Sequence, residues 1–286
     1  MTIVFFGTSE FAVPALEALH EAGFDLTVIT MPDQPMGRKK ILTPPPIKIT
    51  AEKLGLKILQ PPKLKDDTFF EEYKSLQPDF CVIAAYGKII AERYIDTPEY
   101  GFLNIHPSLL PKYRGPTPIQ SAILNGDTET AVTIMQIDKD MDHGPILMQK
   151  KYAIGPDETF LELHDRLANE GSKLLIEIIE NFSTITPHEQ DHSQATFIKI
   201  YERADGKIDW SLSPQEIYNQ IRALNPEPGT WTTWQDKILN IQEARIKKQE
   251  SREELEIIKL QLEGKKETSF ADFLSGHPSF DISQLK

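Results

Sequence analysis

Two polar side chains lie two residues apart at the end of a predicted strand, and their types are suited to chemistry. The apolar run 102–105 predicts a strand that stops at His106, where a proline-rich loop begins. Alternation along a strand places Asn104 and His106 on the same face. An amide donor and an imidazole can stabilise developing negative charge or move a proton. On spacing alone, an ordinary polar strand end is the simpler explanation.

A third polar candidate, Asp142, lies in a loop between two predicted strands. Residues 131–137 and 146–153 alternate well enough to form strands, and the loop 138–145 between them has turn chemistry. If the two strands pair as a hairpin, the loop returns Asp142 towards the end of the central strand. The loop carries three aspartates but lacks the glycine and closing glutamate of an EF-hand, so we expect no metal there.

The element that must position these residues is a parallel sheet. The chain opens with a strand at 2–6, a helix that ends at Gly23 and a second strand at 26–31. This order predicts an α/β fold with a Rossmann-like, mostly parallel sheet and helices on both faces. The first turn contains one glycine, Gly7, where a dinucleotide fingerprint needs three, which disfavours a nicotinamide enzyme. In open sheets of this kind, ligands bind at the carboxyl ends of the strands.

The remaining periodic segments divide the chain into two predicted domains. An amphipathic helix from Thr159 to Phe182 closes a domain at 1–183, and a polar linker follows at 184–200. The segment 201–286 predicts a β-rich domain that opens with a helix capped by Ser213. The other predicted helices are 46–54, 66–76, 117–124 and 269–274, and the other predicted strands are 57–59, 79–85, 231–234, 237–246 and 255–262.

Composition excludes several classes of protein. The 286 residues are 40% hydrophobic and 26% charged, as in an ordinary globular protein. No apolar run approaches the ~18 residues that span a bilayer, and the first residues lack the basic region of a signal peptide. The single cysteine, Cys81, lies in an apolar run and is expected in the core. We therefore expect a cytoplasmic protein, and the net charge of −12 argues against indiscriminate nucleic-acid binding.

The predicted linker contains a sequence that matches a zinc-protease motif. Residues 188–192 read HEQDH, which fits HExxH. That motif binds zinc only on a helix, where both histidines share a face and a third ligand arrives. Because Pro187 precedes the match and no apolar stripe accompanies it, chance is the better explanation.

The segment around Asn104 resembles the signature of folate-dependent formyltransferases. The pattern is Asn104-x-His106-Pro107-Ser108-Leu109-Leu110-Pro111-x-x-Arg114-Gly115, and Asp142 in MDHGPIL is similar to the third catalytic position of that family. Segments FFGTxxFA at 5–12, PIQ at 118–120, TIMQ at 133–136 and KIDW at 207–210 resemble the methionyl-tRNA branch. The similarity is colinear and covers most of the chain.

The resemblance implies a reaction and a set of site residues. It implies that Asn104, His106 and Asp142 are catalytic in transferring a formyl group from 10-formyltetrahydrofolate to initiator methionyl-tRNA, with no metal and no covalent enzyme intermediate. It implies that the folate is bound by Tyr86, Gly87, Ser108, Leu109, Leu110 and Pro111. It further implies that the basic loop residues Arg38, Lys39 and Lys40 contact tRNA, although a short charge run is usually only solvated. We expect a monomer.

Two other functions stay open. The family includes enzymes that formylate amino-sugar nucleotides, and the second domain departs from the tRNA branch. Relatives carry a β-barrel similar to an oligonucleotide-binding fold, whereas residues 247–255 are here one charged stretch. We therefore expect a reduced barrel, open or smaller. The third possibility, a non-catalytic folate- or RNA-binding module, is disfavoured by the intact set of Asn104, His106 and Asp142.

Overall fold

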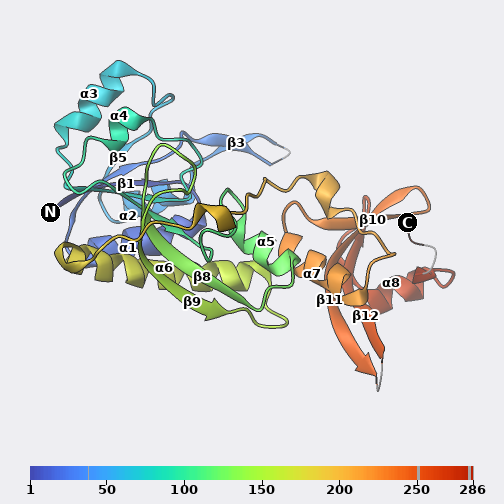
Figure 1. Cartoon of the computed structure of the whole chain (residues 1–286). Coiled ribbons are helices and arrows are strands. Elements are labelled where there is room, and N and C mark those ends of the chain that lie inside the picture. Colours follow the sequence, from blue (N-terminus) through green and yellow to red (C-terminus); the bar gives the residue numbers. More distant parts are fainter. Residues whose placement is uncertain (38, 250–251, 283–284, 286) are drawn as a thin grey trace. The chain divides into compact units, whose positions relative to one another are not determined.

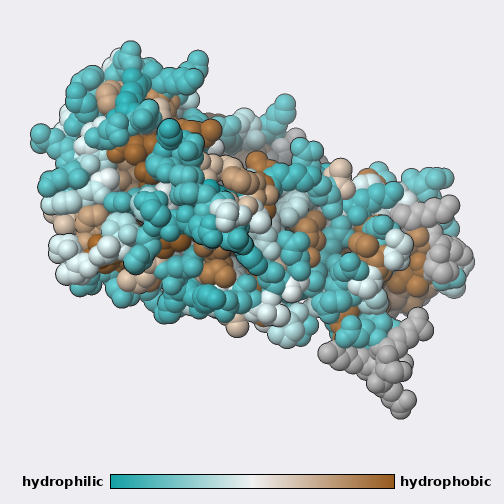
Figure 2. Space-filling view, in the orientation of Figure 1, coloured by the Kyte–Doolittle hydropathy of each residue, from teal (hydrophilic) through white to brown (hydrophobic). Residues whose placement is uncertain are grey.

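The computed structural model describes residues 1–37, 39–249, 252–282 and 285. They form two compact units, one of residues 1–114, 131–152 and 164–196, the other of 115–130, 153–163 and 197–286. The domain boundaries at 183 and 201 stay a prediction. In the structure, two segments from the first part of the chain, 115–130 and 153–163, belong to the second unit. Along the part of the chain that the structure describes, no helix is long and apolar enough to cross a membrane. The face of the molecule seen in Figure 2 is mostly hydrophilic.

The first unit is built on a seven-stranded, mostly parallel sheet (Figure 1). The strand order is β5-β2-β1-β6-β7-β8-β9. The strands are β1 (Thr2–Gly7), β2 (Asp25–Ile29), β5 (Lys57–Leu59), β6 (Phe80–Ala84), β7 (Phe102–His106), β8 (Glu129–Gln136) and β9 (Ile146–Ala153). The first five pair in parallel and β8 runs antiparallel to β7. The predicted fold class is confirmed.

Helices cover both faces of this sheet (Figure 1). They are α1 (Val13–Glu21), α2 (Pro46–Lys53), α3 (Asp67–Ser75), α4 (Glu92–Ile95) and α6 (Phe160–Asn181), with short 3-10 turns at Glu10–Ala12, Phe182–Thr184 and His192–Gln194. On one face, Phe6 and Phe102 pack with Tyr73 of α3 and Tyr94 of α4. On the other face, Gly171 of α6 lies so close to the sheet that a Cβ there would be 2.7 Å from Ile105. The central strands β1, β6 and β7 are buried on both faces, as parallel strands usually are.

A short hairpin lies where the sequence predicts only a long loop, at 32–46. Strands β3 (Gln34–Met36) and β4 (Ile41–Thr43) pair antiparallel and stand away from the large sheet (Figure 1). All six residues are exposed, so no burial pattern marks them in the sequence. Gly37 and Lys40 adopt positive φ of 67° and 48°, which allows the tight connection.

The second unit contains an antiparallel four-stranded sheet in the order β10-β11-β12-β13. The strands are β10 (Thr230–Trp234), β11 (Lys237–Gln249), β12 (Arg252–Leu262) and β13 (Thr268–Ser269), and the helices are α5 (Pro118–Leu124), α7 (Pro214–Leu224) and α8 (Phe270–Gly276), with a 3-10 turn at Arg203–Gly206. The core of this sheet includes Ile217 and Ile221 of α7 and Phe273 of α8. Ser213 accepts from the backbone N–H of Glu216, which confirms the predicted helix start.

The prediction that the charged stretch 247–255 lacks strands is wrong. β11 and β12 instead extend beyond Ile246 and Leu255 into one long hairpin. Opposite charges face each other across it: Arg245 lies 2.6 Å from Glu256, and Lys259 lies 2.8 Å from Glu243. Cross-strand pairs of opposite charge stabilise antiparallel strands without any apolar pattern. Part of the stretch, residues 250 and 251, lies outside the described residues.

Candidate functional site

Asn104 and His106 lie at the carboxyl end of β7, and both approach the same carboxylate oxygen of Asp142. The Asn104 Nδ2 atom donates to Asp142 Oδ1 at 3.4 Å, and His106 Nδ1 lies 3.7 Å from that oxygen. The shared partner confirms that the two side chains project from one face of the strand. The second distance is too long for a direct hydrogen bond.

A backbone carbonyl fixes the tautomer of His106. The Nε2 atom lies 3.0 Å from the carbonyl oxygen of Tyr113. Because a carbonyl can only accept, Nε2 carries the proton in this hydrogen bond. In the neutral ring, Nδ1 therefore holds the lone pair and faces Asp142. The side chain is buried, with 4% of its residue surface exposed, so water screens this nitrogen little.

Asp142 reaches the strand end because the 138–145 loop folds back, as the hairpin prediction required. β8 and β9 are neighbours in the sheet, and Asp142 adopts a positive φ of 48° between them. Gly144 follows so tightly that a Cβ there would lie 2.1 Å from the Gln136 carbonyl oxygen. The three predicted catalytic residues therefore lie together at one rim of the sheet.

The segment predicted to line a folate pocket borders this rim, with mainly its backbone available for contacts. Ser108 is fully buried, its hydroxyl donates to the Lys112 carbonyl, and its own carbonyl accepts from Thr133. Leu110 is 3% exposed, and its carbonyl accepts from Gln149 Nε2. The peptide between Leu110 and Pro111 is cis. Leu109 and Pro111 are half-buried, which leaves them as the apolar side chains that a ligand can reach.

Tyr86 and Gly87 follow the neighbouring strand β6. The Tyr86 side chain is 2% exposed in the core, and burial raises the pKa of its phenol to about 12. Its carbonyl accepts from the Thr8 hydroxyl at 2.8 Å. The exposed Gly87 has a positive φ of 82°. Any ligand contact at these two positions is therefore made by backbone rather than by the phenol.

Two of the three predicted tRNA-binding residues lie at the turn of the β3–β4 hairpin. Lys39 and Lys40 are both exposed, and Arg38 lies outside the described residues. Asp33, just before β3, accepts from Gln60 and from Lys48, and these two hydrogen bonds hold its pKa below the ordinary value. This cluster ties the first strand of the hairpin to the body of the unit.

The HEQDH sequence does not lie on an α-helix. His188 forms an isolated antiparallel bridge with Ile146, and the 3-10 turn begins only at His192. The two imidazoles therefore lack the shared helical face that the zinc motif needs. Gln190, between them, is 5% exposed and contacts the Asp142 loop. Its neighbours in the sequence are polar, so no apolar period predicted that this side chain is buried.

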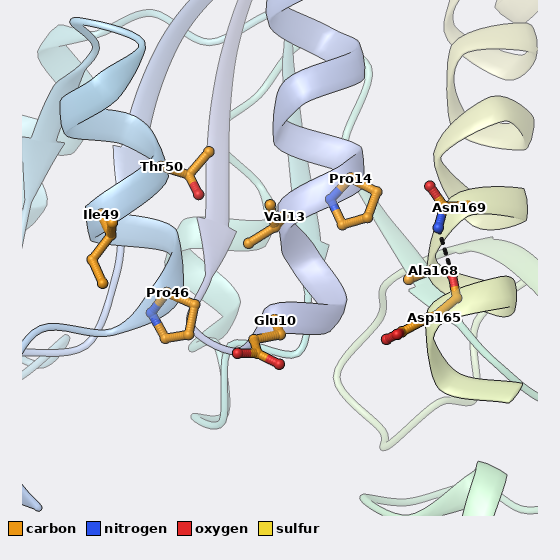
Figure 3. A pocket seen from close by; sticks show the side chains of 9 residues that line it. All are labelled: Glu10, Val13, Pro14, Pro46, Ile49, Thr50, Asp165, Ala168 and Asn169. Atoms are coloured by element: carbon orange, nitrogen blue, oxygen red, sulfur yellow. Dashed lines mark hydrogen bonds between the residues drawn. The ribbon is translucent and has the colours of Figure 1, made fainter. Parts of the chain in front are cut away.

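A cavity in the same unit, drawn in Figure 3, has none of these residues in its lining. It measures about 460 Å³ and is lined by Glu10, Val13, Pro14, Pro46, Ile49, Thr50, Asp165, Ala168 and Asn169. The lining includes two acids and no basic side chain, and the Asn169 amide donates to the Asp165 carbonyl. Because its charged side chains are both acidic, this cavity does not suit an anionic substrate. Asn104, His106 and Asp142 are not among its lining residues.

Fold and sequence together define the class of this protein. Residues 1–179 match the family model described as "Formyl transferase", and residues 201–255 match "Formyl transferase, C-terminal domain". The chain belongs to the formyltransferase family.

Individual relatives place it more narrowly. A methionyl-tRNA formyltransferase of Chloroflexus aurantiacus is 46% identical over 86% of this chain and 80% of that protein. One from Acidobacterium capsulatum is 42% identical over 97% of both chains. A solved sugar 3N-formyl transferase, WlaRD, in the presence of dTDP and 5-N-formyl-THF, has a TM-score of 0.66 at 21% identity and covers 87% of each chain. At that identity the likeness concerns the fold alone.

Proposed function

We infer that this chain transfers the formyl group of 10-formyltetrahydrofolate to the α-amino group of methionyl-tRNA, the reaction that prepares the initiator tRNA for translation. One observation carries the inference. The amide, imidazole and carboxylate of Asn104, His106 and Asp142 meet at one strand end, in a chain 46% identical to a methionyl-tRNA formyltransferase over 86% of its length.

The side chains at this rim suit the charges of the reaction. A bond forms between the amine nitrogen and the formyl carbon, the bond from that carbon to N10 breaks, and one proton moves from the amine to N10. Negative charge develops on the formyl oxygen, and a donor aimed at it in a dry site accelerates the reaction about 10²–10³-fold. Asn104 Nδ2 is the amide donor at this rim.

His106 and Asp142 are proposed to carry out the proton transfer. With Nε2 held by the Tyr113 carbonyl, the lone pair on His106 Nδ1 is free to accept the proton of the attacking amine. The carboxylate of Asp142 then stabilises the resulting imidazolium, because it lies on the same side of the ring. Since Asp142 keeps 15% of its side chain exposed, a water molecule can complete the relay to the leaving nitrogen.

The folate is proposed to lie along the loop 108–111 and the turn at Tyr86–Gly87. The donor set at the rim fits a formyl group, and the half-buried Leu109 and Pro111 with the 93% exposed Ile89 offer apolar surface for a flat ring system. A sugar formyltransferase with the same fold was solved with 5-N-formyl-THF, which supports a folate as the donor class. When bound, the folate supplies the activated one-carbon group.

The tRNA is proposed to contact the β3–β4 hairpin. Two lysines at the turn are exposed, and so are three large apolar side chains on its strands, Met36, Ile41 and Leu42, which are 59–64% exposed. Lysines neutralise phosphates and supply affinity rather than base identity. The apolar side chains give the hairpin surface that a bound nucleic acid would shield from water.

Three further properties are proposed with this function. The protein acts in the cytoplasm, where charged initiator tRNA is found, and it acts as a monomer. Its catalytic domain spans 1–183 and its β-rich domain 201–286, joined by 184–200.

A formyl-transfer assay tests the function. The chain is offered 10-formyltetrahydrofolate together with methionyl-tRNA or, in parallel, a panel of amino-sugar nucleotides, and formyl-methionine released from the tRNA is measured. Turnover on methionyl-tRNA that falls steeply with salt supports the proposal. Turnover on a sugar alone would contradict it and retain the catalytic residues.

A further inference from the structure

We propose that Gln190 is a positioning residue for formyl transfer. Its buried side chain bridges Arg114 and the backbone carbonyl of Asp142, and thereby holds Asp142 in place. The inference rests on the proposed function and assigns a task to a segment that sequence patterns present as a linker. The name "strap" is used below for residues 188–196, which run between the two loops that hold His106.

The Gln190 side chain is buried and fully engaged. Its Nε2 atom donates to the carbonyl oxygens of Asp142 at 3.0 Å and Gly144 at 2.8 Å. Its Oε1 atom accepts from Arg114 through Nη2 at 2.6 Å and Nε at 3.2 Å. The residue is 5% exposed and Arg114 is 3% exposed. A buried amide with both ends bonded is held in one orientation.

The bridge links the two contacts that orient His106. Tyr113, whose carbonyl accepts from His106 Nε2, directly precedes Arg114. Asp142, whose carboxylate faces His106 Nδ1, has its own carbonyl held by Gln190. One arginine–glutamine pair therefore spans from one side of the imidazole to the other.

Both residues that flank the imidazole have a costly backbone conformation. Tyr113 has a φ of 62° and Asp142 a φ of 48°, in the left-handed region that non-glycine residues seldom adopt. Such conformations persist only when the surroundings over-determine them. Here the surroundings are the strap: its Thr196 carbonyl accepts from the Arg114 backbone N–H, and its hydroxyl accepts from the Tyr113 N–H.

The strap is attached at its other end as well. His188 and Ile146 exchange two backbone hydrogen bonds of 2.8 Å, at the first residue of β9. The His192 ring stacks on His143 of the Asp142 loop with centroids 3.9 Å apart, and its Nδ1 accepts from Arg114 Nη2 at 2.9 Å. The strap thus holds the Asp142 loop at three points, and Gln190 is the one nearest Asp142.

The sharpest test is the substitution Gln190→Glu. It keeps the size of the side chain and its acceptors for Arg114, but it removes both N–H donors to the carbonyls of Asp142 and Gly144. The carboxylate oxygen that replaces Nε2 repels these two carbonyl oxygens, so the substitution displaces the Asp142 loop while it keeps the partner of Arg114. We expect kcat on methionyl-tRNA to fall about 10–100-fold, the effect usual for residues that orient catalytic ligands, with KM for either substrate changed less than about threefold.

A double-mutant cycle with Asp142→Asn separates positioning from stability. If Gln190 acts through Asp142, then Gln190→Glu lowers kcat strongly in the natural background and by less than about twofold beside Asp142→Asn. Equal losses in both backgrounds would overturn the proposal. The exposed Gln77, which lies between α3 and β6 and outside the strap, provides the matched control Gln77→Glu, for which kcat stays unchanged.

A second variant covers the case in which Gln190→Glu fails to fold. His192→Phe, at an exposed position, keeps a ring to stack on His143 and removes the acceptor for Arg114. A several-fold loss of kcat at constant KM supports the bridge, and an unchanged kcat contradicts it. Turnover by the natural protein tests the proposed function separately, and the cycle can be run on whichever amine the natural protein formylates.

Discussion

At the scale of single residues, the site is a small set of groups whose protons are assigned by their neighbours. The Tyr113 carbonyl determines which nitrogen of His106 carries hydrogen, and the Asp142 carboxylate faces the other nitrogen. Asn104 donates to the same carboxylate oxygen. An amide, an imidazole and a carboxylate suffice for transfer of an acyl group to an amine, because no covalent intermediate on the protein is required.

The resemblance to the formyltransferase signature singled out these three residues, because spacing alone favoured an ordinary polar strand end. Periodicity predicted only their placement: the strand puts Asn104 and His106 on one face, and the hairpin loop returns Asp142 towards that strand. The sequence did not predict a role for Gln190, because its partners are the backbone carbonyls of Asp142 and Gly144, and every residue type has a backbone carbonyl. Side chains that act on backbone groups leave no pattern of residue types.

The buried thiol of Cys81 gives a prediction at this scale. Burial raises the pKa of the thiol, and its sulfur lies 3.2 Å from the Tyr73 hydroxyl. In the folded state the thiol therefore stays protonated at pH values where the unfolded chain has begun to ionise, near pH ~8.5. The folded protein binds more protons than the unfolded chain there, so the free energy of unfolding decreases as pH rises above that value.

The corresponding measurement is the rate of reaction with an aromatic disulfide reagent. We expect the native protein to react far more slowly at pH ~8.5 than the protein in denaturant. Fast modification of the native protein would show that Cys81 is accessible and contradict its place in the core.

At the scale of elements, the Asp142 loop depends on close backbone approach at Gly144. A Cβ at this position would lie 2.1 Å from the Gln136 carbonyl oxygen and 3.1 Å from its carbon. Backbone atoms cannot move aside as a flexible side chain can, so Gly144→Ala must displace the loop. We expect a loss of about 1–3 kcal/mol in the free energy of unfolding and a larger fall in kcat than in folate affinity.

Chemical denaturation and steady-state kinetics check this prediction. Gly276→Ala is the control, because a Cβ at Gly276 meets no atom within 4 Å. That variant should retain the stability and activity of the natural protein. If Gly144→Ala behaved like the control, the tight loop would not be what holds Asp142 in place.

The β3–β4 hairpin gives a second prediction at the element scale. Replacing Lys39 and Lys40 by glutamine removes two exposed charges from its turn. We expect weaker binding of methionyl-tRNA and a salt dependence that is lower by about one unit per lysine, with folate binding unchanged. Binding titrations across a range of salt concentrations measure both quantities.

A charge-matched control is available for the hairpin variant. Lys63 and Lys65 are also exposed and lie in another loop of the same unit. Their replacement by glutamine changes the net charge equally. Equal losses of tRNA affinity in the two variants would mean that total charge, rather than the hairpin, governs binding.

The elements that the sequence did not predict share one property: they have no buried apolar face. The hairpin strands are exposed on both faces, and the extension of β11 and β12 places Lys247 opposite Glu254, a cross-strand pair of opposite charge. Apolar periodicity arises where one face of an element is buried, so α6 and α7 were visible in the sequence. Strands held by ion pairs or left in solvent have no such period.

At the scale of the whole molecule, an acidic chain acts on an acidic substrate. The net charge of −12 repels tRNA at long range, so productive binding must rely on local basic groups, for which we propose the lysines of the hairpin. Within the part of the chain that the structure describes, the second unit adds a sheet of four strands. The reduced barrel stays a prediction, and its premise that the charged stretch 247–255 lacks strands is wrong, because β11 and β12 extend into that stretch.

The most direct test of the account is the single-turnover rate of formyl transfer to methionyl-tRNA by the natural protein and by His106→Ala, with both substrates saturating. The account predicts that the variant is slower by about 10²–10⁴-fold while its folate affinity barely changes. His20→Ala, at an exposed position on α1, should match the natural protein. A His106→Ala variant as fast as the natural protein would contradict the assignment of the catalytic site.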